Sequence, residues 1–347
     1  MHPQESILLA GTYTDTGSQG IYSFSFNKDE GSARMLHTFQ TPHPSFLITA
    51  PEFRKVYAVN EANGEEARLT MLDICPDTGI LHVAGSVPSL GDGRCHVSHH
   101  GLAIGISNYG AGNMSIYRCD SQGMPTCAIA TFKGHTGGPC LERQSQPHVH
   151  STLFGQDGKY LYATDFSNDC ILVTEILPGC ILPIPDIAAR LSPGTGPRHM
   201  SLSPDGQYLY VIGEINGEVS VFHCLSDGQL KHLQTICDDH DNGYGSAHIV
   251  CSQDGKFLYT SHRVNRNGIS LWERSSGNGT IRHLEFFPTG IHPRHFCISP
   301  DGKFLLVACR DSNSIDIYHR NASTGKLTVT GQHIDILSPV CVQFYQF

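Results

Sequence analysis

The feature that most constrains this chain is a repeat of about 50 residues, in which a short strand, a turn and a second strand return in the same order. Two degenerate copies begin near Pro44 and Cys95. The four clearest copies each carry Asp-Gly between two apolar segments, and they occupy 149–162, 197–210, 246–259 and 293–306. A period of this length indicates one supersecondary unit that recurs along the whole chain.

Each repeat is predicted to form four antiparallel strands. Asp-Gly is typical of tight hairpins, and we expect positive φ at both of its residues to match the strand twist. Third strands are expected at 170–175, 219–223, 269–273 and 315–319. Fourth strands follow a further turn, as at 228–235 and 325–330. Four antiparallel strands per unit describe one blade of a β-propeller.

The seventh unit is split between the two ends of the chain. Residues 339–344 supply an inner strand, and residues 6–13 and 20–26 supply outer strands. Pairing them in one blade closes the ring and removes exposed sheet edges. We therefore predict an all-β protein, a single domain over 1–347, folded as a seven-bladed β-propeller of four-stranded antiparallel blades whose last blade joins the N- and C-terminal strands.

Composition excludes several classes of partner. The net charge is −9 and no run of Lys or Arg occurs, so neither nucleic acid nor a membrane is an expected partner. The apolar run at 7–10 is too short for a signal or a span, which predicts a cytoplasmic protein. The 13 cysteines are irregularly spaced without Cys-x-x-Cys, and most are expected to be small buried hydrophobes rather than disulfides or zinc ligands.

Aligning the copies converts the sequence into rings of residues around a central channel. Two adjacent positions at the start of the first strand and one at the end of the second strand change charge from blade to blade, whereas the turns and apolar strands stay constant. Such variation predicts a ligand site at the channel mouth. The first position contains Ser45, His150, Arg198, Ala247 and Arg294, with Cys95 and Val340 assigned by a looser alignment; the second contains Phe46, His96, Ser151, His199, His248, His295 and Cys341; the third contains Glu61, Glu214, Arg263 and Arg310, joined by Asp165 when the alignment is slipped by one residue.

Arginines gathered in an acidic protein favour an anionic ligand, because the guanidinium binds carboxylate or phosphate through two parallel donors. Glu214 and Asp165 would orient the neighbouring basic groups. Three alternatives remain open. His199 and His295 could instead hydrogen-bond adjacent blades, Arg263 and Arg310 could form structural salt bridges with Glu61 or Glu214, and Asp and Glu around the channel could hold a hard metal ion.

Residues 196–216, followed by Val219-Ser-Val-Phe, resemble the seven-bladed β-propeller lactonases. Supporting segments are 149–151, 108–116, 247–249 and 293–296, and the resemblance covers nearly the whole chain. The family includes bacterial cytoplasmic 6-phosphogluconolactonase, and the fungal carboxymuconate-lactonizing enzymes are similar but more distant.

The resemblance implies a catalytic set of His150, Arg198 and Glu214. His150 would be the general base, Arg198 would hold the oxyanion and Glu214 would fix one of them in place. Substrate-binding residues are expected at Arg263, Arg294, His199, His248 and Asp165.

The implied reaction is hydrolysis of a small anionic lactone, 6-phosphogluconolactone, by a monomer or weak homodimer without metal or cofactor. One alternative is a muconate-type lactonizing cycloisomerase. Another is a non-catalytic binding propeller, which the single Trp and the missing Gly-His…Trp-Asp signature argue against.

Overall fold

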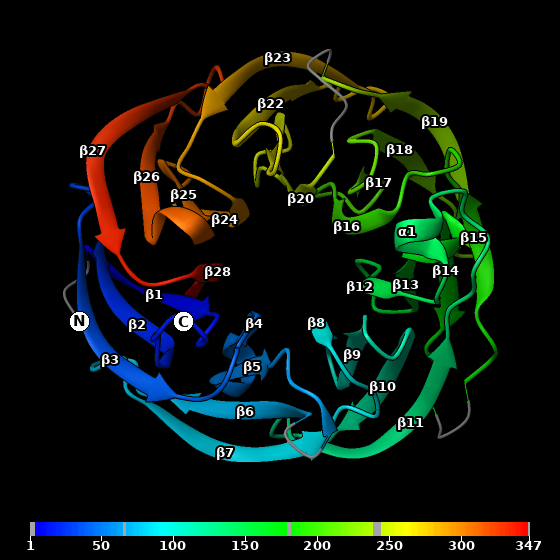
Figure 1. Ribbon diagram of the computed structural model, residues 1–347, viewed down its shortest axis with the longest axis horizontal. Helices are drawn as coiled ribbons and strands as arrows, with labels where there is room; N and C mark the ends of the chain where they lie inside the picture. Colours follow the sequence, from blue (N-terminus) through cyan, green and yellow to red (C-terminus); the bar gives the residue numbers. More distant parts are fainter. Residues whose placement is uncertain (1–3, 65–66, 179–181, 239–243, 346–347) are drawn as a thin grey trace.

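The computed structural model describes residues 4–64, 67–178, 182–238 and 244–345. Seven four-stranded antiparallel sheets surround a central axis (Figure 1), which confirms the predicted propeller. The short helix α1 (Leu141–Gln144) is the only α-helix within those ranges. No helix in this part of the chain is long and apolar enough to cross a membrane.

Six blades each contain four consecutive strands, named here from the axis outwards. They are β4 (Phe46–Ala50), β5 (Lys55–Val59), β6 (Arg68–Ile74) and β7 (Leu81–Pro88); β8 (Arg94–His100), β9 (Ala103–Asn108), β10 (Asn113–Cys119) and β11 (Pro125–Lys133); β12 (Val149–Phe154), β13 (Tyr160–Asp165), β14 (Cys170–Glu175) and β15 (Asp186–Arg190); β16 (Pro197–Leu202), β17 (Tyr208–Gly213), β18 (Val219–Cys224) and β19 (Leu230–Ile236); β20 (Ser246–Cys251), β21 (Phe257–His262), β22 (Gly268–Arg274) and β23 (Ile281–Pro288); β24 (Pro293–Ile298), β25 (Phe304–Cys309), β26 (Ser314–Arg320) and β27 (Leu327–Asp335).

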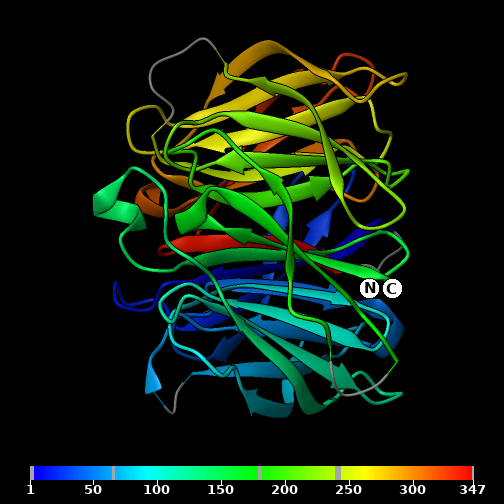
Figure 2. The same ribbon diagram turned by 90° about the vertical axis from the view of Figure 1, so that its right-hand side faces the viewer.

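The remaining blade joins the two ends of the chain. Its innermost strand is β28 (Pro339–Tyr345), followed outwards by β1 (Glu5–Thr12), β2 (Gly20–Asn27) and β3 (Ala33–Gln40). β28 pairs with β1 in antiparallel register, with Ile7 opposite Tyr345. The predicted closure is confirmed, and Figure 2 shows both termini on one face of the ring with α1 on the other.

The Asp-Gly turns differ from the prediction in one respect. Only the glycine is left-handed, with φ of 71° at Gly158 and 72° at Gly302, and the aspartates before them are absent from the positive-φ residues. The loop of the hairpin is longer than two residues: its closing hydrogen bond runs from Ser299 N–H to Phe304 O, at 2.8 Å. The Asp301 carboxylate accepts from Ser299 Oγ at 2.6 Å, so the aspartate supports the turn with its side chain rather than with its backbone.

Adjacent blades are joined by apolar packing and by buried polar contacts. Phe257 and Tyr259 of one blade pack against Leu305 and Val307 of the next. Tyr259 Oη donates to Gly325 O at 2.7 Å and accepts from Arg320 Nε at 2.8 Å. One blade earlier, Tyr210 Oη likewise donates to Gly279 O and accepts from Arg274 Nε. The repeat therefore specifies the joints between blades as well as the blades.

The 12 cysteines of the described ranges are free thiols, and half of them are buried. Burial raises the pKa of several, among them Cys119 and Cys170 to about 12. Within the same ranges no three His, Cys, Asp or Glu side chains are placed to hold a metal ion.

Candidate functional site

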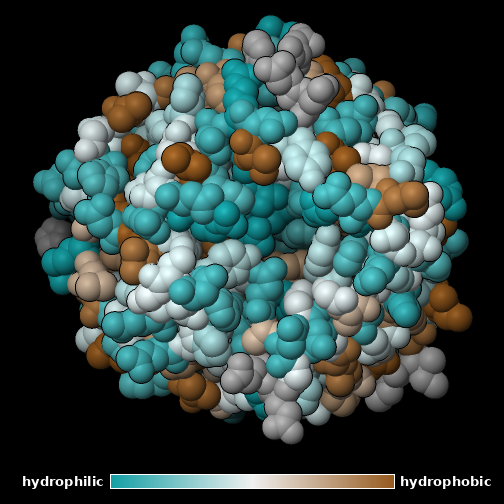
Figure 3. Space-filling model, in the orientation of Figure 1, coloured by the Kyte–Doolittle hydropathy of each residue, from teal (hydrophilic) through white to brown (hydrophobic). Residues whose placement is uncertain are grey.

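A polar cavity of about 220 Å³ lies at the axis, on the face where the innermost strands begin. Figure 3 views this face and shows hydrophilic groups around a central hollow. The lining residues come from the ends of strands in different blades and from α1. They are Tyr13, Glu61, Cys95, Tyr109, Arg143, His150, Glu214, Arg263 and Arg294.

Glu214 joins three arginines at this site. It follows β17, and its backbone N–H donates to Gly196 O at 2.9 Å. Oε2 accepts from Arg198 Nε at 2.8 Å and lies 3.1 Å from Arg263 Nη2, while Oε1 accepts from Arg143 Nη2 at 2.7 Å. Burial raises the pKa of Glu214, but the charges of Arg263 and Arg198 outweigh burial and hold it well below its ordinary value. The carboxylate is therefore ionised.

His150 lies beside Glu214, with Nε2 3.9 Å from Oε2. Its Nδ1 lies 3.8 Å from Cys95 Sγ. Burial, followed by the charge of Arg198, lowers the pKa of His150 well below 6.5. The imidazole is neutral near pH 7, so one of its ring nitrogens is available to accept a proton.

Arg294 lines the cavity together with a second carboxylate, Glu61. Its Nη2 lies 3.8 Å from Glu61 Oε2, which is beyond hydrogen-bond distance. Its guanidinium lies over the Tyr13 ring at 5.3 Å, and the Tyr13 hydroxyl donates to Glu61. The guanidinium N–H groups of Arg294 are therefore not hydrogen-bonded to Glu61 and can donate to a ligand in the cavity.

Three residues predicted to be catalytic or substrate-binding lie deeper than the cavity. Arg198 does not line it; Nη1 donates to Ala247 O at 2.6 Å and lies 3.2 Å from His199 Nε2. His199 Nδ1 in turn lies 2.7 Å from His248 Nδ1. Arg198 is thus placed to act through Glu214 and His150, and direct substrate contact by His199 and His248 stays a prediction that this arrangement does not favour.

Aromatic rings close the channel beneath the cavity. Phe46 lies 4.2 Å from His96 between ring centroids, His199 lies 5.0 Å from both His96 and His248, and His248 stacks on His295 at 3.9 Å. The aromatic residues of the second ring of the sequence alignment therefore pack into a plug. It agrees with the alternative in which His199 and His295 connect neighbouring blades.

Asp165 was aligned with Glu214 through a slip of one residue. In the structure it is the last residue of β13, and Phe166 occupies the position after the strand. Asp165 Oδ2 accepts from the backbone N–H of His135 at 2.8 Å, and the residue is not among those lining the cavity. Burial raises its pKa. Asp165 is therefore engaged by His135, and its contact with substrate stays a prediction that this arrangement does not favour.

Sequence reasoning missed Tyr13, Tyr109 and Arg143. Tyr13 and Tyr109 directly follow β1 and β9, the second strands from the axis in their blades, as Glu214 follows β17. The position after the second strand was therefore the signal that identifies both tyrosines. Arg143 has no equivalent in the repeat, because it lies on α1 in the connection between β11 and β12.

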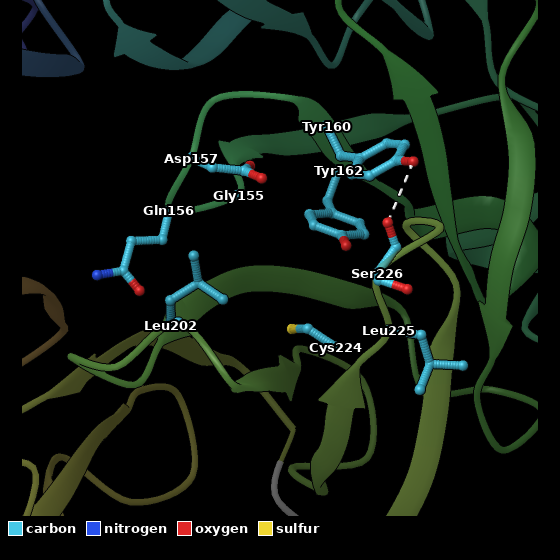
Figure 4. A pocket seen from close by; sticks show the side chains of 10 residues that line it. Gly155, Gln156, Asp157, Tyr160, Tyr162, Leu202, Cys224, Leu225 and Ser226 are labelled. Atoms are coloured by element: carbon cyan, nitrogen blue, oxygen red, sulfur yellow. Dashed lines mark hydrogen bonds between the residues drawn. The ribbon is translucent and has the colours of Figure 1, made fainter.

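A larger groove lies at the turns between the β12–β15 and β16–β19 blades (Figure 4). Its volume is about 590 Å³, and Tyr160, Tyr162, Leu202 and Leu225 are among its walls. No Arg, Lys or His belongs to its lining residues, and Asp157 is the carboxylate there. The smaller axial cavity is therefore the one with groups suited to chemistry.

The lactonase family, described as seven-bladed β-propellers, matches residues 7–344 of this chain. The chain belongs to this family of lactone-hydrolysing enzymes, as its sequence segments predicted. Its curated relatives include the 6-phosphogluconolactonase of Formosa agariphila, which is 31% identical over 98% of this chain and 99% of that protein. The 6-phosphogluconolactonase of Bacillus subtilis is 27% identical over 96% and 97%.

Two solved structures show the same fold. A Bacteroides uniformis protein, provisionally assigned as a 6-phosphogluconolactonase, is 42% identical with a TM-score of 0.94 over 99% of this chain and 100% of its own. The periplasmic gluconolactonase of Pseudomonas aeruginosa is 29% identical with a TM-score of 0.90 over 99% of both chains. Because that relative is periplasmic, the cytoplasmic location stays a prediction.

Proposed function

We propose that this lactonase hydrolyses 6-phosphogluconolactone to 6-phosphogluconate. The observation that carries the proposal is the charge of the site. Four arginines, at 143, 198, 263 and 294, meet two carboxylates, at 61 and 214, in a chain whose net charge is −9. This local excess of positive charge favours a doubly charged anion such as a phosphate monoester. Two relatives carry the same activity in their names.

Ring opening requires a nucleophilic water and a proton for the leaving ring oxygen. In the proposed mechanism neutral His150 takes a proton as water attacks the lactone carbonyl carbon. The tetrahedral intermediate then collapses, the bond from the carbonyl carbon to the ring oxygen breaks, and His150 returns the proton to that oxygen. The product is the open-chain acid, which ionises in water.

Negative charge develops on the carbonyl oxygen during attack. Arg294 is proposed to stabilise this charge, because its nearest carboxylate is 3.8 Å away and its donors face the cavity. Glu214 keeps Arg263 and Arg143 in place. Arg198 is proposed as a positioning residue, since its contacts hold Glu214 and its charge adds to the burial that keeps His150 neutral.

The proposal is tested by the hydrolysis rate of freshly prepared 6-phosphogluconolactone, corrected for spontaneous opening. His150→Ala and Arg294→Ala should each lower kcat by roughly 100-fold or more, with thermal unfolding close to that of the parent enzyme. Arg282→Ala, which removes an exposed arginine paired with Glu273, is the control and should change neither quantity. Full activity in both cavity variants would refute the mechanism, and an inactive parent enzyme would refute the substrate.

A further inference from the structure

The helix α1 brings an arginine to the cavity from outside the blades. It lies in the connection from β11 to β12, and Figure 1 shows it over the β12–β15 blade. The Arg143 side chain is 27% exposed, compared with 3% for Arg198, 6% for Arg263 and 16% for Arg294. Among these four cations, Arg143 is therefore the one nearest to solvent at the cavity mouth.

The helix is fixed to the blades by the residue after Arg143. The buried Gln144 side chain donates to Phe166 O at 2.9 Å and to Asp169 Oδ1 at 2.8 Å. Asp169 also accepts the backbone N–H of Gly196 at 2.8 Å, two residues before Arg198. The Asp169 carboxylate thus connects α1 to the residues that lead into β16. These contacts hold Arg143 in a fixed position relative to the cavity.

The partners of Arg143 do not fully neutralise its charge, so it can still bind an anion. Its Nη2 donates to Glu214 Oε1 at 2.7 Å, but Glu214 also neutralises Arg198 and Arg263. The same Nη2 lies 3.3 Å from Tyr109 Oη. Burial raises the pKa of Tyr109, so the hydroxyl stays protonated and can donate to an anion. Its ring stacks on His148 at 4.0 Å, which fixes the direction of the hydroxyl.

We propose that Arg143 and Tyr109 bind the phosphate of the substrate, and that α1 thereby sets the preference for phosphorylated over unphosphorylated lactones. This assignment rests on the proposed function. The carbonyl end of the lactone lies deep, between His150 and Arg294, and the phosphate on the far side of the sugar ring points to the mouth. The mouth offers one guanidinium and one hydroxyl, which together match a phosphate monoester.

The experiment compares kcat/KM for 6-phosphoglucono-δ-lactone with kcat/KM for glucono-δ-lactone. Arg143→Gln should lower the ratio of the two values by roughly 10- to 100-fold, chiefly through a higher KM for the phosphorylated lactone. Arg143→Lys should recover part of the ratio, and Tyr109→Phe should lower it by a smaller factor. Leu141→Ala, an exposed position on the same helix, is the matched control and should leave the ratio unchanged.

Two further outcomes are distinguishable. If Arg143→Gln lowers both values equally, the residue acts only through Glu214, and the phosphate assignment is wrong while the proposed function stands. If the parent enzyme opens neither lactone, the proposed function fails and this assignment fails with it. Should Arg143→Gln unfold, Tyr109→Phe still decides, because an unchanged ratio in a folded Tyr109→Phe protein would overturn the shared phosphate site.

Discussion

At the scale of single residues, burial and the neighbouring arginines together decide the charge state of the site. Glu214 remains ionised because three guanidinium groups surround it, whereas His150 remains neutral because it is buried and adjoins the charge of Arg198. Burial lowers the pKa of Arg263 to about 9, which still leaves it charged near pH 7. A neutral base beside fixed positive charges is the state that the proposed mechanism uses.

The acid limb of the activity profile should therefore lie at low pH. Since the pKa of His150 is lowered well below 6.5, the neutral base persists as pH falls through 6.5 and is lost only further down. We expect kcat/KM to stay nearly constant from about pH 8 to about pH 6 and to fall below that. Initial rates across this range, corrected for spontaneous opening, test the expectation; a half-maximal value at or above pH 6.5 would contradict it.

At the scale of strands, bulges at the start of the inner strands shape the site. The pairing register shifts between Pro197 and His199, between Pro293 and His295, and between Val149 and Thr152. A bulge breaks the strict alternation of side chains, so two successive residues can point toward the axis. This is why Arg198 reaches Glu214 while His199, the next residue, joins the plug. β4 pairs with β5 without such a shift.

The joint between blades makes its own prediction. Arg320 is buried and donates to Tyr259 Oη at 2.8 Å and to Gly302 O at 3.1 Å. Arg320→Met should leave these acceptors with fewer partners and lower the free energy of unfolding by about 1–3 kcal/mol. Arg282→Met, at an exposed ion pair, should cost about 1 kcal/mol or less. Urea unfolding of both variants is the measurement, and equal losses would show that the buried joint adds nothing.

At the scale of the whole molecule, the ring is closed by pairing of the innermost strand β28 with β1, and its axis is filled by the histidine plug. His96, His199, His248 and His295 come from four different blades and meet across the channel. Burial lowers the pKa of His96 and of His295 to about 3. These two rings are therefore neutral near pH 7, where they pack against the other rings of the plug.

This arrangement makes stability depend on pH with a definite sign. In the unfolded chain His96 and His295 bind protons below about pH 6.5, whereas in the folded plug the pKa of each is about 3. Stability is therefore complete above pH 6.5 and falls as pH decreases, by about 1.4 kcal/mol per pH unit for each such histidine. Urea midpoints near pH 8 and pH 5 measure the loss. His295→Gln should make the dependence shallower, and an identical slope would refute the role of the plug.

The order and closure of the blades were readable in the sequence. Each blade is a local unit of strands and turns, so its signals repeat along the chain, and residues at equivalent positions must converge on the axis. That argument identified His150, Glu214, Arg263 and Arg294, which the structure brings to one cavity.

What the tertiary structure alone decided is how deep each side chain lies and which groups come from outside the repeat. Arg198 and His199 lie beneath the cavity, although His150 and Arg294 line it from strands with the same kind of bulge, and Asp165 at the end of β13 accepts from His135. Arg143 belongs to an α-helix that has no counterpart among the described residues of the other blades. Contacts across the axis join blades that are far apart in the sequence. The periodic pattern specifies the strand register within each blade, but it does not specify the distance between side chains of different blades.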